Sequence, residues 1–132
     1  DFPENIASIK MFPDTVAVVS TLYRKNLPLG IVSSNFSGHI QKTLVSKGME
    51  SYFQALSCSD QYKKGKPDAE PCLYCLEKMG LSPSKSICYV GDSLQDVECA
   101  QRAGLVGILL DRENKHPDFP GLKIASLYEL VF

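Results

Sequence analysis

Short apolar runs alternate along the chain with longer segments in which apolar residues recur every three or four positions. The two clearest runs cover residues 29–32 and 87–90, and two weaker ones cover 55–58 and 106–110. Continuous apolar runs of this length are typical of parallel strands that are buried on both faces. We therefore predict four parallel strands.

The segments between these runs have helical periodicity. Helices are predicted over residues 14–25, 37–47, 68–79, 93–103 and 126–130. Asp68 is a candidate N-cap, and Gly80 and Gly104 follow predicted helices at a position where glycine commonly ends them. Strands that alternate with helices imply right-handed crossovers. The sequence therefore predicts a three-layer, Rossmann-like α/β fold around a parallel sheet.

The composition excludes several classes of partner. A formal net charge of -1 over 132 residues argues against nucleic-acid binding, which needs a basic surface. No apolar run is long enough to span a bilayer, so a membrane partner is not expected. Five cysteines without a recognisable secretory signal suggest reduced thiols and a cytoplasmic protein. Cys72 and Cys75 have a metal- or redox-type spacing, but a predicted helix contains both, which favours buried thiols.

Polar residues follow the first strand at the edge of the sheet where ligands bind in such folds. Ser33, Ser34 and Asn35 come directly after the run 29–32. A hydroxyl and consecutive amides at a strand-to-helix turn form a donor site for an anion. The alternative is that the serine caps the next helix.

Charged residues follow at two further places. Lys66 stands inside a Gly-Lys-Pro loop, either projecting toward a phosphate or belonging to a solvated basic loop. Asp92 follows the run 87–90, and Asp96 lies one helical turn later on the same face. Two such carboxylates suit Mg²⁺, although a cap at Asp92 or Ser93 and a first-turn acid at Asp96 explain them equally well.

In combination, these features resemble a known family. A strand followed by Ser33, Gly-Lys-Pro around Lys66, and Gly-Asp-x-x-x-Asp ending at Asp96 resemble motifs II, III and IV of the haloacid dehalogenase (HAD) superfamily. The likeness is to its phosphoglycolate phosphatase-like, capped branch, and it covers nearly the whole chain.

The resemblance implies a Mg²⁺-dependent phosphomonoester phosphatase that acts on a small phosphorylated metabolite through an aspartyl-phosphate intermediate. Ser33 and Lys66 would be catalytic, and Ser33, Ser34, Asn35 and Lys66 would bind the phosphate. Asp92 would hold the Mg²⁺, together with Asp96 either directly or through water.

Motif I of that family, an apolar strand followed by Asp-x-Asp, has no match in this sequence. Asp1 has no strand before it, Asp14 starts a helix, and Asp60 is not followed by a second aspartate two places later. The aspartate that attacks phosphorus is therefore expected to lie outside these residues, and the chain by itself is expected to be inactive.

The missing strand would lie in the centre of the family's sheet. We therefore expect an HAD-like fold that is incomplete at the N-terminus, without its first central strand and most of its cap. Residues 1–10 would be the tail of the helical cap and residues 11–132 the core. An upstream segment or another chain would supply the strand, and the oligomeric state is open.

Three other functions fit parts of the pattern. A 2-haloacid dehalogenase of this fold uses no metal and carries Ser and Asn where this chain has Gly91 and Asp92. A phosphomutase would share all of the motifs. A non-catalytic binding or scaffold domain would explain the absent motif I.

Overall fold

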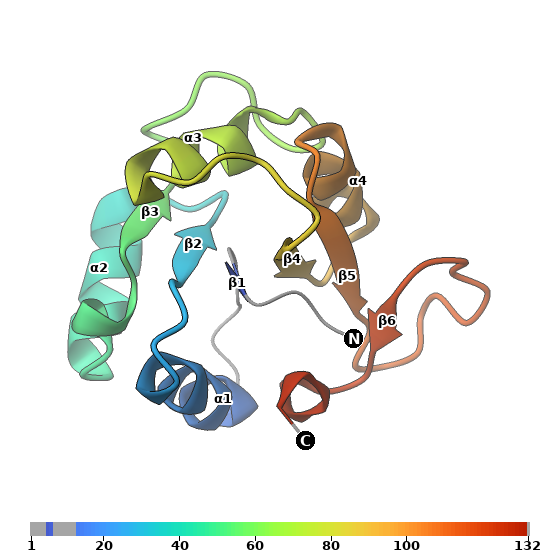
Figure 1. The fold of residues 1–132 in the computed structure, drawn as a ribbon, viewed down its shortest axis with the longest axis horizontal. Coiled ribbons are helices and arrows are strands. Elements are labelled where there is room, and N and C mark those ends of the chain that lie inside the picture. The colour runs from blue at the N-terminus through green and yellow to red at the C-terminus, as the bar shows by residue number, and fades with distance from the viewer. Residues whose placement is uncertain (1–4, 7–12, 132) are drawn as a thin grey trace.

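Strands and helices alternate along the chain in the predicted order (Figure 1). The structure is a computed structural model, which describes residues 5–6 and 13–131. The strands are β1 (Asn5–Ile6), β2 (Gly30–Val32), β3 (Ala55–Ser57), β4 (Ile87–Gly91), β5 (Val106–Leu110) and β6 (Lys123–Ile124). The helices are α1 (Pro13–Arg24), α2 (Ser37–Ser46), α3 (Glu70–Met79) and α4 (Leu94–Arg102), with 3-10 helices η1 (Glu50–Tyr52) and η2 (Leu127–Leu130).

Helix ends agree with the sequence in most places and differ in two. Gly80 and Gly104 have positive φ angles of 72° and 85°, as their place after a helix predicted. The prediction that Asp68 is an N-cap was wrong, because α3 begins at Glu70. The Asp68 carboxylate instead accepts a hydrogen bond from the Glu70 amide at 2.9 Å, in a turn before the helix. The last predicted helix is the 3-10 helix η2.

All strand pairings among the described residues are parallel, and they form two sheets. One sheet has the order β1-β4-β5-β6, and the other pairs β2 with β3. Strands β1 and β6 were not predicted, since each has only two residues, which are too few to give a periodic pattern. The parallel α/β class is confirmed.

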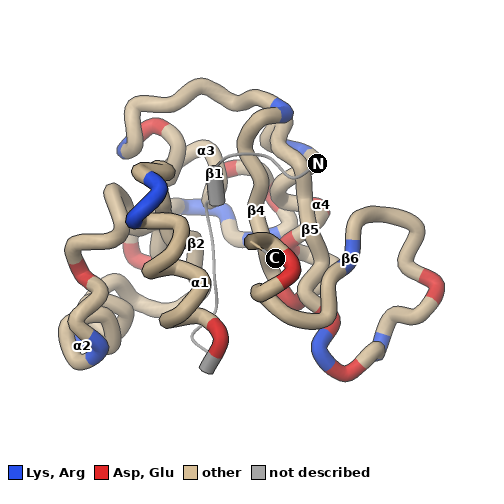
Figure 2. Tube along the Cα trace, turned by 60° about the horizontal axis from the view of Figure 1, so that its bottom comes forward, with Lys and Arg blue, Asp and Glu red and all other residues tan. Residues whose placement is uncertain are grey.

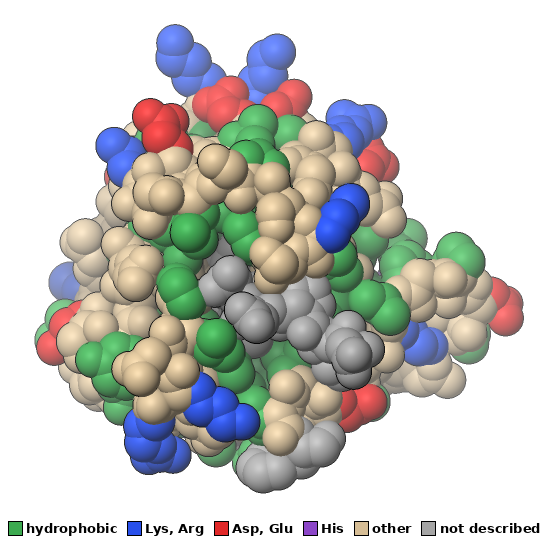
Figure 3. All heavy atoms as spheres, in the orientation of Figure 1, with side chains coloured by type: hydrophobic (Ala, Val, Ile, Leu, Met, Phe, Trp, Pro, Cys, Tyr) green, Lys and Arg blue, Asp and Glu red, His purple; other side chains and the backbone are tan. Residues whose placement is uncertain are grey.

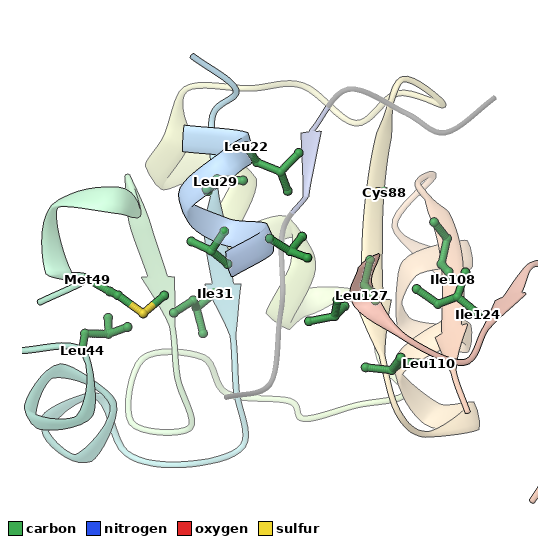
Figure 4. Close-up of a cluster of buried hydrophobic side chains, with 13 residues drawn as sticks. Leu22, Leu29, Ile31, Leu44, Met49, Cys88, Ile108, Leu110, Ile124 and Leu127 are labelled. Atoms are coloured by element: carbon green, nitrogen blue, oxygen red, sulfur yellow. The ribbon is translucent and has the colours of Figure 1, made fainter. Parts of the chain in front are cut away.

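Helices cover both faces of the strands and make three layers. A first core cluster joins α1, α2 and η2 to the strands, and a second joins α3 and α4 to them. Figure 4 shows the first cluster, in which Ile31 of β2 and Cys88 of β4 belong to the same core although their strands are in different sheets. The two sheets are therefore held together by packed side chains.

The separation of the sheets falls where the sequence predicted a missing strand. No strand pairing joins β2 to β4 among the residues described, and in Figure 1 the two strands stand on either side of the short β1. β1 pairs with β4 through Asn5 opposite Ile87 and Ile6 opposite Cys88. On the face seen in Figure 3, hydrophobic side chains gather on both sides of the centre. The prediction that residues 1–10 are a cap tail falls mainly outside the described residues and stays a prediction.

Figure 2 shows acidic and basic residues dispersed over the trace, with no element carrying a basic stripe. Within the described residues, no helix combines the length and the apolar character that crossing a membrane requires.

A partly buried ion pair joins the start of α1 to the C-terminal part of the chain. The two terminal guanidinium nitrogens of Arg112, Nη1 and Nη2, donate to the Asp14 carboxylate at 3.0 and 2.8 Å. The Ser126 hydroxyl and the Leu127 amide donate to the same carboxylate at 3.1 and 2.9 Å. The hydrogen bonds from Arg112 outweigh the cost of burial and hold the pKa of Asp14 below its usual 3.8.

Replacing Asp14 by asparagine is expected to lower the free energy of unfolding by about 2–3 kcal/mol at neutral pH, because the Arg112 charge loses its partner in a partly buried place. Since folding lowers this pKa, the stabilisation exists above pH 3.8 and disappears as the pH falls through the folded value. Urea unfolding of both proteins between pH 7 and 3 would measure this, and the two curves should converge in acid. Glu113→Gln, which breaks an exposed pair with Lys115, should change stability by less than about 0.5 kcal/mol.

Candidate active site

A cavity of about 590 Å³ opens where β2 and β4 end. Every site residue that the sequence nominated lines it, although the residues are up to 63 positions apart: Ser33, Ser34, Asn35, Lys66, Asp92 and Asp96. The cavity also continues between the strands, because Ile31 and Val32 of β2 and Tyr89 and Val90 of β4 line it as well. The parallel arrangement of β2 and β4 brings their carboxyl ends to one rim.

Lys66 is fixed in this cavity by an ion pair. Its Nζ lies 2.7 Å from Asp96 Oδ1, and its side chain is 13% exposed. The ammonium also lies over the ring of Tyr89, 5.3 Å from the centroid. The interpretation of Lys66 as part of a solvated loop was therefore wrong, and that description fits only its exposed neighbours Lys63 and Lys64.

Both oxygens of Asp96 are engaged by protein donors. Oδ1 accepts from Lys66 and from the Tyr89 hydroxyl, the latter at 3.1 Å. Oδ2 accepts from the Ser93 amide at 3.1 Å, and the Ser93 hydroxyl accepts from the Asp96 amide, which forms a capping box at the start of α4. The alternative interpretation, with Ser93 as the cap and Asp96 as a first-turn acid, is thus correct for local structure. It also leaves Asp96 suited to orienting Lys66.

Burial by itself raises the pKa of Asp96, but the net pKa is lowered. The positive charge of Lys66 and the hydrogen bonds from Lys66 and Ser93 outweigh the cost of desolvating the carboxylate. Asp96 is therefore ionised at neutral pH, and Lys66 faces a full negative charge.

Gly91 is required by the approach of α4 to the end of β4. A Cβ atom on Gly91 would overlap the side chain of Asp96, including its Cβ and Cγ atoms. Gly91→Ala is therefore expected to lower the free energy of unfolding by about 2–3 kcal/mol, because Asp96 and its helix must shift. The measurement is urea unfolding, with Gly38→Ala as the control, since a Cβ there would meet nothing within 4 Å. Equal stabilities would contradict this account.

The turn after β2 presents hydroxyl and amide groups to the cavity. The Ser33 hydroxyl accepts from the Asn35 amide at 3.0 Å. Ser33 does not cap the next helix, because the N-cap of α2 is Phe36, which makes no side-chain cap. The cap alternative for Ser33 was therefore wrong, and its hydroxyl proton remains available to an anion.

Asp92 is exposed at the end of β4, at the rim of the cavity. Among residues 5–6 and 13–131, no three His, Cys, Asp or Glu side chains form a group that could hold a metal ion. Mg²⁺ is commonly bound by one or two carboxylates, with waters and phosphate oxygens completing the octahedron. Asp92 therefore fits as one ligand of a shared site. The ion pair with Lys66 engages Asp96 in this chain, and its role toward Mg²⁺, directly or through water, stays a prediction.

Sequence reasoning missed several residues of the site. Tyr89 is buried under Lys66 and hydrogen-bonded to Asp96, yet in the sequence it is one apolar-type residue within a strand. His39 and Thr43 of α2 and Gln95 of α4 also line the cavity. His39 and Gln95 lie in the first turns of helices that follow ligand-binding strands, and this position is the signal that could have identified them.

The cysteines are free and buried, as the sequence predicted. Cys75 does not join Cys72 in a pair, because its thiol points to the Ile31 carbonyl at 3.9 Å. Cys72 lies against Cys99 instead, with 3.4 Å between the sulfurs.

Comparisons with known proteins identify the family. The family described as haloacid dehalogenase-like hydrolase matches residues 3–109. The chain is 31% identical over 94 residues to phosphoglycolate phosphatase of Escherichia coli K12, which covers 71% of this chain and 37% of that protein. It superimposes on a HAD phosphatase from Thermococcus onnurineus with a TM-score of 0.81 at 30% identity, covering 92% of this chain and 56% of the other.

A HAD hydrolase from Bacillus subtilis, solved bound to magnesium, has the same fold, with a TM-score of 0.79 at 24% identity and coverage of 92% of this chain and 53% of that one. The chain thus spans between about a third and three fifths of the length of these proteins. With its site motifs on the expected strands and loops, this chain belongs to the haloacid dehalogenase-like hydrolase family.

Proposed function

We propose that this chain forms part of a phosphomonoester phosphatase that acts on a small phosphorylated metabolite with Mg²⁺. The observation that carries the proposal is the meeting of Ser33, Lys66 and Asp92 at one cavity. A metal-bound phosphoryl group is held by groups of this kind: a hydroxyl with neighbouring amides, a buried ammonium and an exposed carboxylate. The phosphatase names of the E. coli and T. onnurineus relatives support the same class of reaction.

Each residue has a distinct part in this proposal. The Ser33 hydroxyl donates to a phosphoryl oxygen, and the Ser34 amide lies beside it at the same turn. The Asn35 amide donates to the Ser33 hydroxyl oxygen, and the rest of Asn35 lines the cavity. Lys66 neutralises negative charge on the phosphoryl group and on the attacking carboxylate, while Asp96 holds its ammonium in place. Asp92 holds Mg²⁺, which would stabilise charge on the phosphoryl oxygens.

The attacking carboxylate comes, in this proposal, from outside these 132 residues. An apolar strand ending in Asp-x-Asp would enter between β2 and β4 and take the place of the short β1, which pairs there with β4 in this chain. Its first aspartate would attack phosphorus while the bond to the ester oxygen breaks, and the alcohol would leave with a proton from the second aspartate. Water that gives a proton back to the second aspartate would then attack the aspartyl phosphate, which releases phosphate and restores the carboxylate. An upstream segment or another chain could supply this strand, and its pairing would cover apolar strand edges.

The cytoplasmic location remains a prediction that accords with the free thiols.

The test is a panel of phosphomonoesters, assayed on the protein that includes the upstream sequence, with and without Mg²⁺. Hydrolysis that requires Mg²⁺, with an apolar strand ending in Asp-x-Asp upstream, is the expected result. Transfer of the phosphoryl group to a second hydroxyl of the substrate would indicate a phosphomutase, and metal-free release of halide from a 2-haloacid would indicate a dehalogenase. An upstream sequence without the motif, and no turnover, would indicate a binding or scaffold domain.

A further inference from the structure

The turn after β2 is held in place by the loop that follows β3. The Ser59 amide donates to the Asn35 carbonyl at 3.0 Å, and the Tyr62 hydroxyl donates to the Ser33 carbonyl at 2.9 Å. Tyr62 is 9% exposed, so its hydroxyl and the Ser33 carbonyl satisfy each other in a largely dry place. The two ends of the Ser33–Asn35 turn are therefore tied to a single partner loop.

The same loop also caps the helix that follows the turn. Phe36, the N-cap of α2, provides no side-chain acceptor. The Asp60 carboxylate takes that place from outside the helix, accepting from the Ser37 amide at 2.8 Å and from the Ser37 hydroxyl at 2.6 Å. These two hydrogen bonds hold the pKa of Asp60 below its ordinary value, so the cap is an ionised carboxylate at neutral pH.

This loop then continues to Lys66, which also lines the cavity and pairs with Asp96 of α4. Strand pairing does not fix the position of β2 relative to β4 among the described residues, because the two strands belong to different sheets. Besides the packed side chains of the shared core, one loop links the two groups, since it contacts the Ser33 turn and carries Lys66.

We propose that Asp60 and Tyr62 are positioning residues. They hold the Ser33–Asn35 turn in the position where its donors and Lys66 bind the same anion. Neither residue lines the cavity. Tyr62 acts through its hydrogen bond to the Ser33 carbonyl, and Asp60 acts through the cap that it provides at the start of α2. The inference rests on the proposed function, since it assigns these residues to the phosphate-binding part of that site.

The test uses inorganic phosphate as the probe and measures its binding by amide chemical shifts of the isotope-labelled chain. Asp60→Ala removes both acceptors of the cap, and its dissociation constant for phosphate should rise about tenfold, as expected for the loss of hydrogen bonds to a charged group. Tyr62→Phe removes one hydroxyl without changing the shape of the core and should raise it about threefold to tenfold. Asp60→Asn should bind nearly as the wild type does, because a carboxamide can accept from the Ser37 amide and donate to its hydroxyl oxygen.

The protein with the upstream sequence gives a second measurement. For a phosphomonoester, KM should rise in Asp60→Ala and Tyr62→Phe by the same factor as the dissociation constant, while kcat changes less than about twofold. Tyr52→Phe is the matched control, because Tyr52 stacks on Tyr23 away from the cavity and its change should leave KM unaltered.

The outcomes separate this inference from the proposed function. Phosphate binding by the wild type, with equal affinity in Asp60→Ala and Tyr62→Phe, would overturn the positioning role and leave the phosphate site standing. Equal weakening in Asp60→Ala and Asp60→Asn would also overturn it, since charge and not hydrogen-bond geometry would then be responsible. No phosphate binding by the wild-type chain or by the longer protein would overturn the proposed function and this inference together.

Discussion

Lys66→Met is expected to lower phosphatase turnover of the protein with the upstream sequence by about 10²–10³-fold, because a preorganised charge donor is removed from the phosphoryl group. Methionine keeps most of the apolar stem, so the Tyr89 ring stays covered. The same change should also destabilise the fold by about 3 kcal/mol, since Asp96 is left as a buried carboxylate without its cation. Turnover under saturating Mg²⁺ and urea unfolding of the 132-residue chain measure the two effects.

The pH dependence of stability distinguishes this loss from general damage. In the wild type, the folded pKa of Asp96 lies below 3.8, so its contribution to stability exists above that value and is lost as the pH falls through the folded pKa. Without Lys66, desolvation is the largest remaining influence and raises this pKa. The difference in free energy of unfolding between the wild type and Lys66→Met should therefore shrink as the pH falls.

Two companion variants check the assignment. Lys66→Met combined with Asp96→Asn should regain much of the lost stability and none of the activity, because a neutral amide needs no cation. Lys64→Met, in the exposed part of the same loop, should change neither. An active Lys66→Met enzyme would remove Lys66 from the proposed mechanism.

Asp92→Asn is expected to abolish Mg²⁺-dependent turnover, with a fall of about 10³-fold that reflects several kcal/mol of lost charge stabilisation. Because Asp92 is exposed, the free energy of unfolding should change by less than about 0.5 kcal/mol. Asp96→Asn should show a different pattern, with a measurable loss of stability, since it removes the charge opposite Lys66. Turnover as a function of Mg²⁺ concentration, together with urea unfolding, separates a metal ligand from a positioning residue.

Asp118→Asn is the control for this pair, since it removes the same charge from an exposed position in the loop after β5. It should leave both turnover and stability unchanged. Wild-type rates in Asp92→Asn would contradict the proposed metal site.

Much of the candidate site followed from local sequence. Ser33 and Asp92 come directly after strongly apolar runs, and chain direction in a parallel sheet brings such positions to one rim. The Gly-Lys-Pro loop identified Lys66 as a candidate, and the position at the end of a strand identified Gly91. The partners of these residues could not be predicted in this way. Tyr62 reaches Ser33 across 29 positions, and no periodic pattern records a contact of that kind.

The sequence by itself determined the parallel α/β class, the alternation of strands and helices, and the residues that stand at the strand ends. Periodicity and turn residues act over a few positions, so they can be recognised in a single sequence. Only the tertiary structure decided that Asp96 is paired with Lys66, that Asp60 caps a helix to which it does not belong, and that β2 and β4 lie in separate sheets. These features depend on which distant groups meet when the core packs, because a buried charge or an unsatisfied helix end takes whichever partner the fold brings within reach.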